Sequence, residues 1–405
     1  MIYREACGHK LSQLGFGTMR LPQKEDKSID EERVQTMVDM AMAAGVNYFD
    51  TAYPYHGGYS EIVIGKALKK YPRDSYYLAT KYPGHQIAST YDPAAVFEEQ
   101  LKKCDVDYFD FYLLHNVYEN SIDVYKDPRW GIIDYFKEQV KNGRIRHLGF
   151  STHARPETLK AFLDYAGDDM EFCQIQLNYL DWTLQDAKTK VDLLNERAIP
   201  IWVMEPLRGG RLVNLSEKEQ ETLKTLAAQL ENSGLPALNT PAEWGLRFLQ
   251  QVPGVAVILS GMSAEEQMAQ NLKTFESERR LTPEEIELLM KLAEGMKNAL
   301  PCTRCRYCCD GCPMGLDIPM LIHAYNDVKF SGRSSTVAMQ FDALPEDKLP
   351  SACIGCGACA AICPQNIDIP AALAELAETI AQTPSWKEIC RQREEAARKL
   401  AASNK

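Results

Sequence analysis

Short runs of apolar and β-branched residues alternate with longer amphipathic segments along the first two thirds of the chain. The runs have the length of buried strands, and turn-forming residues bound them. They predict eight strands, over residues 13–19, 46–52, 75–82, 107–116, 145–152, 172–178, 199–205 and 255–261. The segments between them repeat apolar positions at the helical period, and several begin with proline or a capping residue. They predict helices that include residues 31–44, 93–104, 156–165, 184–197, 241–251 and 264–272.

A strand followed by a helix, repeated eight times, is typical of a (β/α)8 TIM barrel in the α/β class. An open doubly wound sheet is the alternative, but it needs a G-x-G-x-x-G turn after its first strand. Here Gly15-Phe16-Gly17 lies within the strand and the third glycine is missing. Residues 2–11 predict a hairpin that turns at Cys7-Gly8-His9 and could cover the barrel floor. Residues 216–232 predict an extra helix after the seventh strand.

The patterns divide the chain into four parts. We expect the barrel over residues 1–275, a linker helix within 276–300, a smaller domain over 301–375 and a helical tail over 376–405. Thr282 is the expected N-cap of the linker helix, and acidic residues follow it in the first turn. In the smaller domain we expect a helix over 317–330, a loop over 331–350 and helices from 369 to about 400. This domain is therefore expected to be rich in helix.

Eight cysteines form two copies of the pattern C-x2-C-x2-C-x3-C-P. Such a run wraps three corners of an iron–sulfur cube, and its fourth cysteine binds the other cube. The pattern predicts two [4Fe–4S] clusters. One ligand set is Cys302, Cys305, Cys308 and Cys363, and the other is Cys353, Cys356, Cys359 and Cys312. The likeness of the copies extends past the ligands, because Leu316-Asp317-Ile318-Pro319 repeats as Ile367-Asp368-Ile369-Pro370, which indicates an internal duplication.

Structural zinc is the alternative occupant of these cysteines, although zinc sites more often pair two C-x2-C units. The five remaining cysteines are expected to be structural: Cys7, Cys104, Cys173, Cys309 and Cys390. Cys309 lies inside the first run and is the one rival for a ligand position. Clusters need reduced thiolates, which indicates a reducing cytoplasm.

Charge and length narrow the possible partners. The chain has 405 residues, a hydrophobic content of 45% and a formal net charge of -11. An acidic surface disfavours nucleic acid and anionic membranes. We find neither an apolar leader nor an apolar run that could span a bilayer, so a cytoplasmic protein is expected. The oligomeric state is not legible from the sequence.

Four chemically distinct polar residues stand at or just after predicted strand ends, where TIM barrels place their active sites. They are Asp50, Tyr55, Lys81 and His115. A phenol has an ordinary pKa of about 10. A nearby ammonium is expected to lower that pKa, and a carboxylate fixes the ammonium. Such a set suits proton transfer to a carbonyl oxygen as hydride reaches its carbon. Tyr53 is the rival phenol.

The barrel resembles the aldo-keto reductase family over about residues 10–275. The motifs that carry the resemblance are Gly45-Val46-Asn47-Tyr48-Phe49-Asp50-Thr51-Ala52, Tyr55, Ser60-Glu61, Thr80-Lys81 and Leu113-Leu114-His115. The resemblance implies an oxidoreductase in which Tyr55 is the general acid, Lys81 and Asp50 adjust its acidity, and His115 orients the carbonyl group of a small carbonyl or alcohol substrate. Tyr118, Tyr125 and Trp130 could line the pocket.

The same resemblance implies NAD(P)H as the hydride carrier. Ser151 and Gln174 match residues that hold the nicotinamide amide, and Thr152 replaces a frequent asparagine there. The residues matched to the rest of the dinucleotide are Pro206, Leu207 and Gly209 near the pyrophosphate, and Gln267 and Asn271 near the adenosine end.

Two departures from the family pattern concern the dinucleotide. Met204 stands in place of the aromatic residue that stacks on nicotinamide. Gly261 and Gln267 replace the basic pair that commonly binds the 2′-phosphate of NADP, so strong selection for NADPH is not expected.

The cysteine-rich part resembles the dicluster ferredoxin domain found on some aldo-keto reductase-like proteins. The leading hypothesis is an oxidoreductase whose clusters exchange electrons with a ferredoxin-like carrier. Hydride moves two electrons together, whereas a cluster passes one. A flavin could mediate, but the sequence has no flavin signature. A radical route, purely structural clusters, and an electron-transfer or assembly module with an inactive barrel are the alternatives.

Overall fold

The computed structural model describes residues 1–215, 217–230, 238, 240–296, 300, 302, 306–331, 335–363 and 367–403. The chain forms two compact units. The first is Met1–Leu289 with the stretch that begins at Ala396, and the second is Met290–Glu395. Within the described ranges, no helix combines the length and the apolar character needed to cross a membrane.

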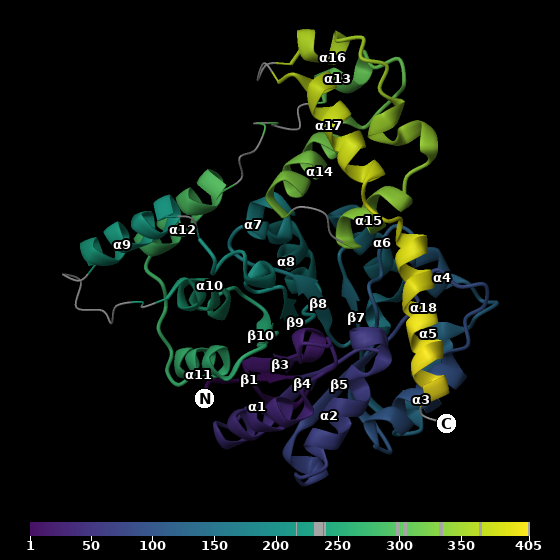
Figure 1. The fold of residues 1–405 in the computed structure, drawn as a ribbon, viewed down its shortest axis with the longest axis vertical. Coiled ribbons are helices and arrows are strands. Elements are labelled where there is room, and N and C mark those ends of the chain that lie inside the picture. The colour runs from purple at the N-terminus through teal and green to yellow at the C-terminus, as the bar shows by residue number, and fades with distance from the viewer. Residues whose placement is uncertain are drawn as a thin grey trace. The chain divides into compact units, whose positions relative to one another are not determined.

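The first unit is built on a closed barrel of eight parallel strands in the order β10-β3-β4-β5-β6-β7-β8-β9 (Figure 1). The predicted TIM barrel is confirmed, and the open doubly wound sheet is excluded. All eight predicted strands are present, each somewhat shorter than or equal to its predicted range: β3 (Leu14–Gly17), β4 (Tyr48–Asp50), β5 (Tyr77–Tyr82), β6 (Phe109–Leu114), β7 (Ile145–Thr152), β8 (Cys173–Gln176), β9 (Ile201–Met204) and β10 (Val255–Ser260).

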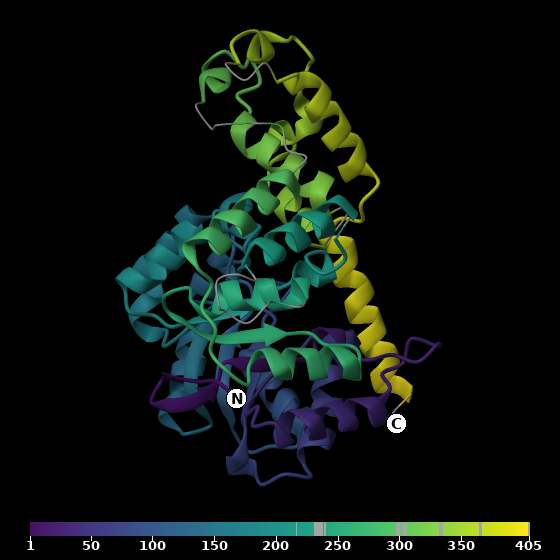
Figure 2. The ribbon, with the colours of Figure 1, turned by 90° about the vertical axis from the view of Figure 1, so that its left-hand side faces the viewer.

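Helices surround these strands, as two views of the barrel show (Figures 1 and 2). Asp30, Asp92 and Thr240 each accept a backbone N–H three residues later and so cap the helices that follow them. The helices of the first unit are α1 (Glu31–Ala43), α2 (Ser60–Leu68), α3 (Pro93–Cys104), α4 (Ile122–Lys126), α5 (Ile132–Lys141), α6 (Pro156–Ala166), α7 (Asp181–Leu184), α8 (Ala187–Glu196), α9 (Glu217–Leu230), α10 (Pro241–Gln250) and α11 (Glu265–Thr274). Helix α12 (Pro283–Met296) begins in the first unit and ends in the second. The extra helix after the seventh strand is α9.

The N-terminal hairpin closes the amino-terminal end of the barrel. Its strands β1 (Tyr3–Ala6) and β2 (His9–Ser12) pair antiparallel, as predicted. Ala6 and Leu11 pack in one apolar cluster with Phe111 and Trp202 of the barrel interior. The carboxyl ends of the strands, where such barrels carry their chemistry, are therefore the end that the hairpin leaves open.

The second unit is helical and shows the duplication directly. Its helices are α13 (Tyr307–Asp310), α14 (Ile318–Ser331), α15 (Ser335–Asp342), α16 (Ala358–Ala361) and α17 (Ile369–Ala381), and α18 (Trp386–Ser403) follows. Asp317 and Asp368 occupy matching places, since each accepts a backbone N–H at the start of its helix. Ile318 and Ile369 both lie in the apolar core of this unit.

The loop predicted over residues 331–350 is wrong, because α15 occupies its middle. Val337 and Phe341 lie one helical turn apart and are both buried in the core of the second unit. Serines before this segment suggested a loop, whereas the apolar pair four residues apart was the helical signal.

Candidate active site and cluster site

The four candidate catalytic residues come from three neighbouring strands of the barrel. Asp50 is the last residue of β4, Lys81 lies near the end of β5, and His115 directly follows β6. Tyr55 begins a short 3-10 turn (Tyr55–Gly58) after β4. Adjacent parallel strands bring their carboxyl ends to the same edge, so residues far apart in the sequence converge here.

Lys81 is the centre of this group. Its Nζ donates to Asp50 Oδ1 at 2.5 Å and to the Thr51 carbonyl at 2.7 Å, and it lies 3.5 Å from Tyr55 Oη. Lys81 is fully buried and Asp50 is 3% exposed. Burying an ion pair costs free energy unless hydrogen bonds compensate for the lost water. A buried ion pair at a strand end of the barrel is therefore a candidate functional site.

The pKa values of this group follow from burial and mutual contact. Burial raises the pKa of Asp50 despite the opposing effect of Lys81. Burial lowers the pKa of Lys81, but Asp50 and Tyr55 outweigh it and leave that pKa above its usual value. Burial also raises the pKa of Tyr55 above 10.0, and Lys81 only partly opposes the increase. Lys81 has the expected lowering effect on the pKa of Tyr55, but burial outweighs it and the pKa lies above its ordinary value.

His115 faces the phenol. Its ring lies 5.9 Å from that of Tyr55 at 84°, an edge-on contact. The backbone of His115 is fixed from two sides, since its N–H donates to Tyr82 and its carbonyl accepts from Tyr125 Oη at 2.7 Å. His85, which sequence reasoning missed, is buried with its ring 4.2 Å from His115. No spacing rule marks His85, because it reaches the site from a loop.

Tyr53, the rival phenol, has a different environment. Its Oη donates to Glu99 at 3.0 Å, and Lys103 lies 4.1 Å from its ring centre. Tyr55 is the phenol that contacts Lys81, at 3.5 Å. Of the expected pocket aromatics, Tyr125 is buried and supports His115, while Trp130 packs on Tyr91.

Ser151 and Gln174 lie directly opposite each other on β7 and β8. Ser151 Oγ accepts the backbone N–H of Asn116 at 2.8 Å. Gln174 is 2% exposed, and its Oε1 has no hydrogen-bond partner among the residues that the structure describes. A buried carbonyl oxygen without a partner fits a ligand that brings an N–H donor, as the carboxamide of nicotinamide does. Thr152 instead donates to the Val117 carbonyl.

Arg20 supplies a cation beside Gly209 and Gly261, two positions matched to the dinucleotide. A Cβ atom on Gly209 would come within 2.8 Å of Arg20 Nη2, and one on Gly261 within 3.5 Å of the Arg20 stem. Arg20 Nη2 also lies 3.7 Å from Glu205 Oε1. Arg20 follows β3 and crosses to loops after β9 and β10, so only the fold reveals its place. Glu205, which follows Met204, adds a carboxylate whose pKa burial raises.

The other residues matched to the dinucleotide lie around the ends of β9 and β10. Gly209 has a φ of 62°, which favours glycine, and Pro206 and Leu207 precede it in the same loop. Asn271 donates to Ser260 Oγ at 3.0 Å, and Gln267 accepts the Ser263 N–H at 2.8 Å. Both polar side chains are thus partly engaged within the protein.

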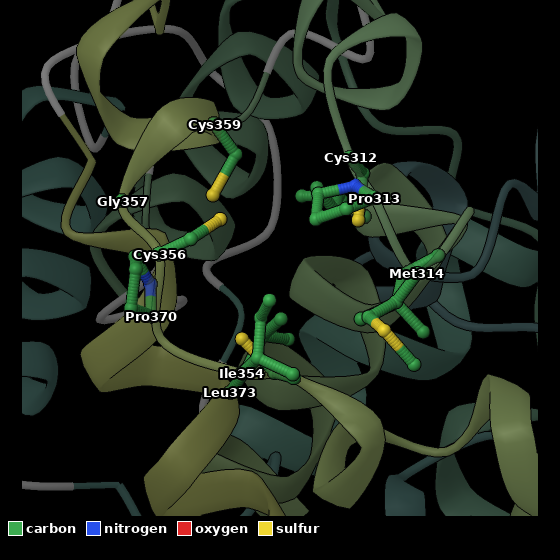
Figure 3. Close-up of a pocket in the computed structure, with 12 residues that line it drawn as sticks. Cys312, Pro313, Met314, Ile354, Cys356, Gly357, Cys359, Pro370 and Leu373 are labelled. Carbon is green, nitrogen blue, oxygen red and sulfur yellow. The ribbon is translucent and has the colours of Figure 1, made fainter.

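A pocket in the second unit brings together one complete set of predicted cluster ligands. Its lining includes Cys353, Cys356, Cys359 and Cys312, the last from the other cysteine run. Figure 3 shows Cys356 and Cys359 on one side and Cys312 across from them. Four thiols around one apolar pocket fit a [4Fe–4S] cube, whose iron atoms take thiolate ligands. Cys356 is exposed, whereas Cys359 is buried.

The first cysteine set is only partly described. Cys305 lies outside the described residues. Cys302, Cys308 and Cys363 all contact the apolar core of the second unit, and so does the rival Cys309. Cys104, Cys173 and Cys390 are buried, and they stay predicted as structural residues.

Comparison with protein families identifies two matches. The model of the aldo/keto reductase family matches residues 13–294. The model of the 4Fe-4S dicluster domain matches residues 301–367.

Among known proteins, the chain is 28% identical over 211 residues to "Probable aldo-keto reductase 1" of Glycine max, and the match covers 50% of this chain and 58% of that protein. It is 24% identical over 325 residues to the "NADH-specific methylglyoxal reductase" of Escherichia coli, with 71% and 96% covered. A solved aldo-keto reductase from Bacillus halodurans, in its holo form, is 27% identical, with a TM-score of 0.58 and 72% and 96% covered.

Proposed function

Because the chain belongs to the aldo/keto reductase family and carries a 4Fe-4S dicluster domain, we propose that its barrel interconverts a small carbonyl compound and the matching alcohol, with Tyr55 as proton donor. The observation that carries the proposal is the buried Lys81 ammonium, which contacts both Asp50 and Tyr55. The ammonium of Lys81 lies beside the Tyr55 hydroxyl, which supports Tyr55 as the donor of a proton to a carbonyl oxygen.

Each residue of the group has a distinct task in this proposal. Tyr55 stays protonated near neutral pH because burial raises its pKa above the ordinary value of a phenol. Lys81 stays charged and stabilises the phenolate that forms as the proton leaves. Asp50 holds Lys81 in place, and His115 orients the carbonyl oxygen toward Tyr55 Oη.

We further propose NAD(P)H as the hydride source. When bound, it supplies a hydride to the carbonyl carbon. Gln174 accepts from the carboxamide through its unpartnered Oε1, and Ser151 lies beside it. Arg20 offers charge-assisted bonds to phosphate near Gly209. The rest of the dinucleotide would contact four further residues: Pro206 and Leu207 near the pyrophosphate, and Gln267 and Asn271 near the adenosine end.

The second unit is proposed to hold two [4Fe–4S] clusters that exchange single electrons with a ferredoxin-like carrier. The exposed Cys356 supports this role, because a ligand at the surface leaves its cluster close to a docked carrier. Burial of Cys308 and Cys359 in the apolar core favours a structural contribution as well.

The test of the catalytic proposal is Tyr55→Phe in the full chain, purified and assayed without oxygen. Methylglyoxal, named for one relative, and a panel of small aldehydes and ketones serve as probes with NADH and NADPH. We expect reduction to fall by at least a thousandfold while dinucleotide binding, measured by calorimetry, stays within threefold. Tyr53→Phe is the matched control and should retain activity. Full activity in Tyr55→Phe would contradict the proposal.

A further inference from the structure

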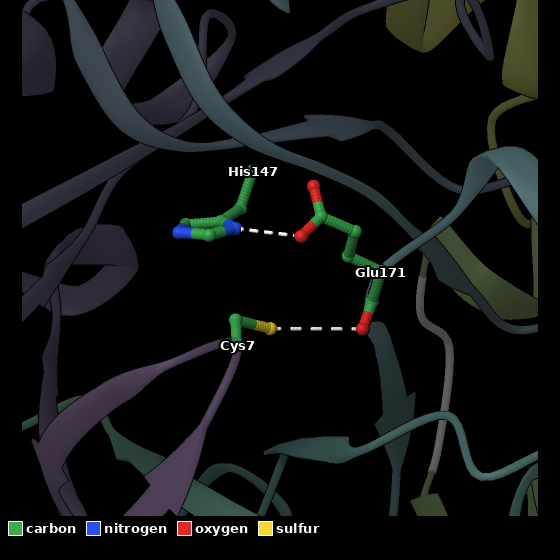
Figure 4. Close-up of side chains that lie close together, drawn as sticks. All are labelled: Cys7, His147 and Glu171. Atoms are coloured by element: carbon green, nitrogen blue, oxygen red, sulfur yellow. Dashed lines mark hydrogen bonds and ion pairs between the residues drawn. The ribbon is translucent and has the colours of Figure 1, made fainter.

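Four donor side chains meet at the amino-terminal end of the barrel, opposite the candidate active site. Cys7 stands at the turn of the β1–β2 hairpin, His9 begins β2, His147 lies in β7, and Glu171 precedes β8. One ligand atom each from Cys7, His147 and Glu171 lies within 4.8 Å of the other two. Figure 4 shows the imidazole, the carboxylate and the thiol converging on one point.

We propose that Cys7, His147 and Glu171 bind a divalent zinc-class ion, with solvent in the fourth position. Sulfur, imidazole nitrogen and carboxylate oxygen are the donors that zinc takes in proteins. The proposal is independent of the function proposed for the barrel mouth.

The three donors lie near enough for an ion to bridge them after a small adjustment. His147 Nδ1 lies 2.7 Å from Glu171 Oε2, a hydrogen-bond distance, and one ligand atom from each of the three residues lies within 4.8 Å of the other two. Donors that share a tetrahedral ion at metal–ligand distances of 2.0–2.3 Å are about 3.3–3.8 Å apart. The Glu171 side chain is 44% exposed, so it can rotate by the small amount required.

The charges also balance. A Cys7 thiolate and a Glu171 carboxylate together cancel the charge of a divalent cation, so the loaded site is neutral. The thiol proton leaves to solvent when the ion binds. The nearby Arg146 does not oppose this balance, because it forms an ion pair with Asp110 at 3.1 Å.

His9 gives the metal-binding histidine its supporting partner. His147 Nε2 lies 2.8 Å from His9 Nε2, and His9 Nδ1 lies 3.4 Å from Tyr77 Oη. Metal-bound histidines almost always donate their second ring N–H to a neighbour. With the ion on Nδ1, His147 donates from Nε2 to His9, and His9 in turn donates from Nδ1 to Tyr77.

The backbone conformation of Cys7 also supports a metal site. Cys7 has a φ of 51° and Gly8 one of 73°, the left-handed pair of a tight hairpin turn. Asn, Asp and Gly are favoured at the first of these positions, so cysteine there is unfavourable for the turn itself. Its side chain is thereby directed at His147 and Glu171 (Figure 4). An ion here would fasten the hairpin to β7 and to the residues before β8.

The test uses the full chain with its clusters reconstituted under anaerobic conditions, and zinc as the probe. We expect one zinc per chain in excess of the cluster metals, retained after gel filtration. X-ray absorption at the zinc edge should show one sulfur with nitrogen and oxygen neighbours, whereas zinc in an empty cluster site would show four sulfurs. Cys7→Ser and His147→Gln should each weaken zinc binding at least tenfold.

Glu5→Gln is the matched control, since Glu5 is exposed on the same hairpin and outside the donor set, and it should bind zinc as the parent does. If Cys7→Ser fails to fold, Glu171→Gln carries the test, because an exposed carboxylate is replaced by a group of the same size. Parent-like zinc binding in Cys7→Ser and His147→Gln, or a spectrum of four sulfurs alone, would overturn the proposal.

Discussion

Tyr55 shows how burial and a single cation compete at one residue. The cation favours phenolate, yet desolvation of the phenolate is the larger effect, and the pKa rises above 10.0. A proton donor benefits from this outcome, because the protonated form persists to higher pH.

The pH dependence of the proposed reaction follows. A group with a raised pKa loses its proton only at higher pH, so the donor form of Tyr55 persists to higher pH than that of an ordinary phenol. We expect kcat/KM for carbonyl reduction to stay level from neutral pH into the alkaline range. Alcohol oxidation needs the phenolate, so its kcat/KM should rise with pH throughout. A decline in reduction centred near neutral pH would show that another group, such as His115, limits the rate.

Arg20 is expected to contribute to dinucleotide binding. Arg20→Gln should weaken binding of both NADH and NADPH about tenfold or more, because a charge-assisted bond contributes about 1.5–3 kcal/mol. Calorimetric titration of each dinucleotide measures the loss. Arg211→Gln is the control, since Arg211 is paired with Glu219 at 3.1 Å, and it should change affinity little. Equal affinities in the parent and Arg20→Gln would remove Arg20 from the site.

Sequence reasoning reached the residues that lie at strand ends and missed those whose place depends on loop paths. Asp50, Lys81 and His115 could be predicted to converge, because strand order alone brings their ends together. Arg20 and His85 could not, since each comes from a loop that crosses to a different strand end. The direction in which Lys81 shifts the pKa of Tyr55 was predicted, but the larger opposing effect of burial was not, because the extent of burial is a property of the fold.

Among the secondary-structure elements, periodicity located the strands of the barrel and most of the helices, and it failed where the pattern was short. Helix α15 has only eight residues, so its apolar repeat spans about two helical turns. The serines before it hid this short helical pattern. Helix α3 was predicted to the residue because proline at its start and a capping aspartate define its beginning.

The packing of α2 against α3 yields a prediction about these elements. Gly65 in α2 faces the end of α3, and a Cβ atom there would lie 2.4 Å from the Cys104 carbonyl oxygen. The backbone of Cys104 cannot move aside as easily as the end of a flexible side chain can. Gly65→Ala should therefore destabilise the protein by about 1–3 kcal/mol. Gly295→Ala in α12 meets nothing within 4 Å and should stabilise by up to ~1 kcal/mol through helix propensity. Denaturant unfolding of both variants measures the contrast, and equal effects would contradict the packing argument.

At the scale of the whole molecule, the proposed function combines two-electron and one-electron transfer in one chain. A hydride carrier moves two electrons, and each proposed cluster moves one. The duplication that produced Asp317 and Asp368 as matching helix caps also supplied two ligand runs, and the pocket shared by Cys312 with Cys353, Cys356 and Cys359 joins the copies. A domain that needed metal only for its stability would not require two [4Fe–4S] clusters.

Cys356→Ser separates an electron relay from a structural staple. Cys356 is exposed, so serine there disturbs packing little while removing a ligand of one cube. Iron and sulfide should fall from about eight to about four atoms each per chain. We expect the variant to keep its melting temperature and its turnover with NADH, and to lose turnover driven by reduced ferredoxin. Cys309→Ser is the control and should keep both clusters and both activities. If Cys356→Ser reduces its substrate with either donor at the parent's rate, the relay is wrong, and if both activities fall together with the melting temperature, the clusters act as structural metal centres.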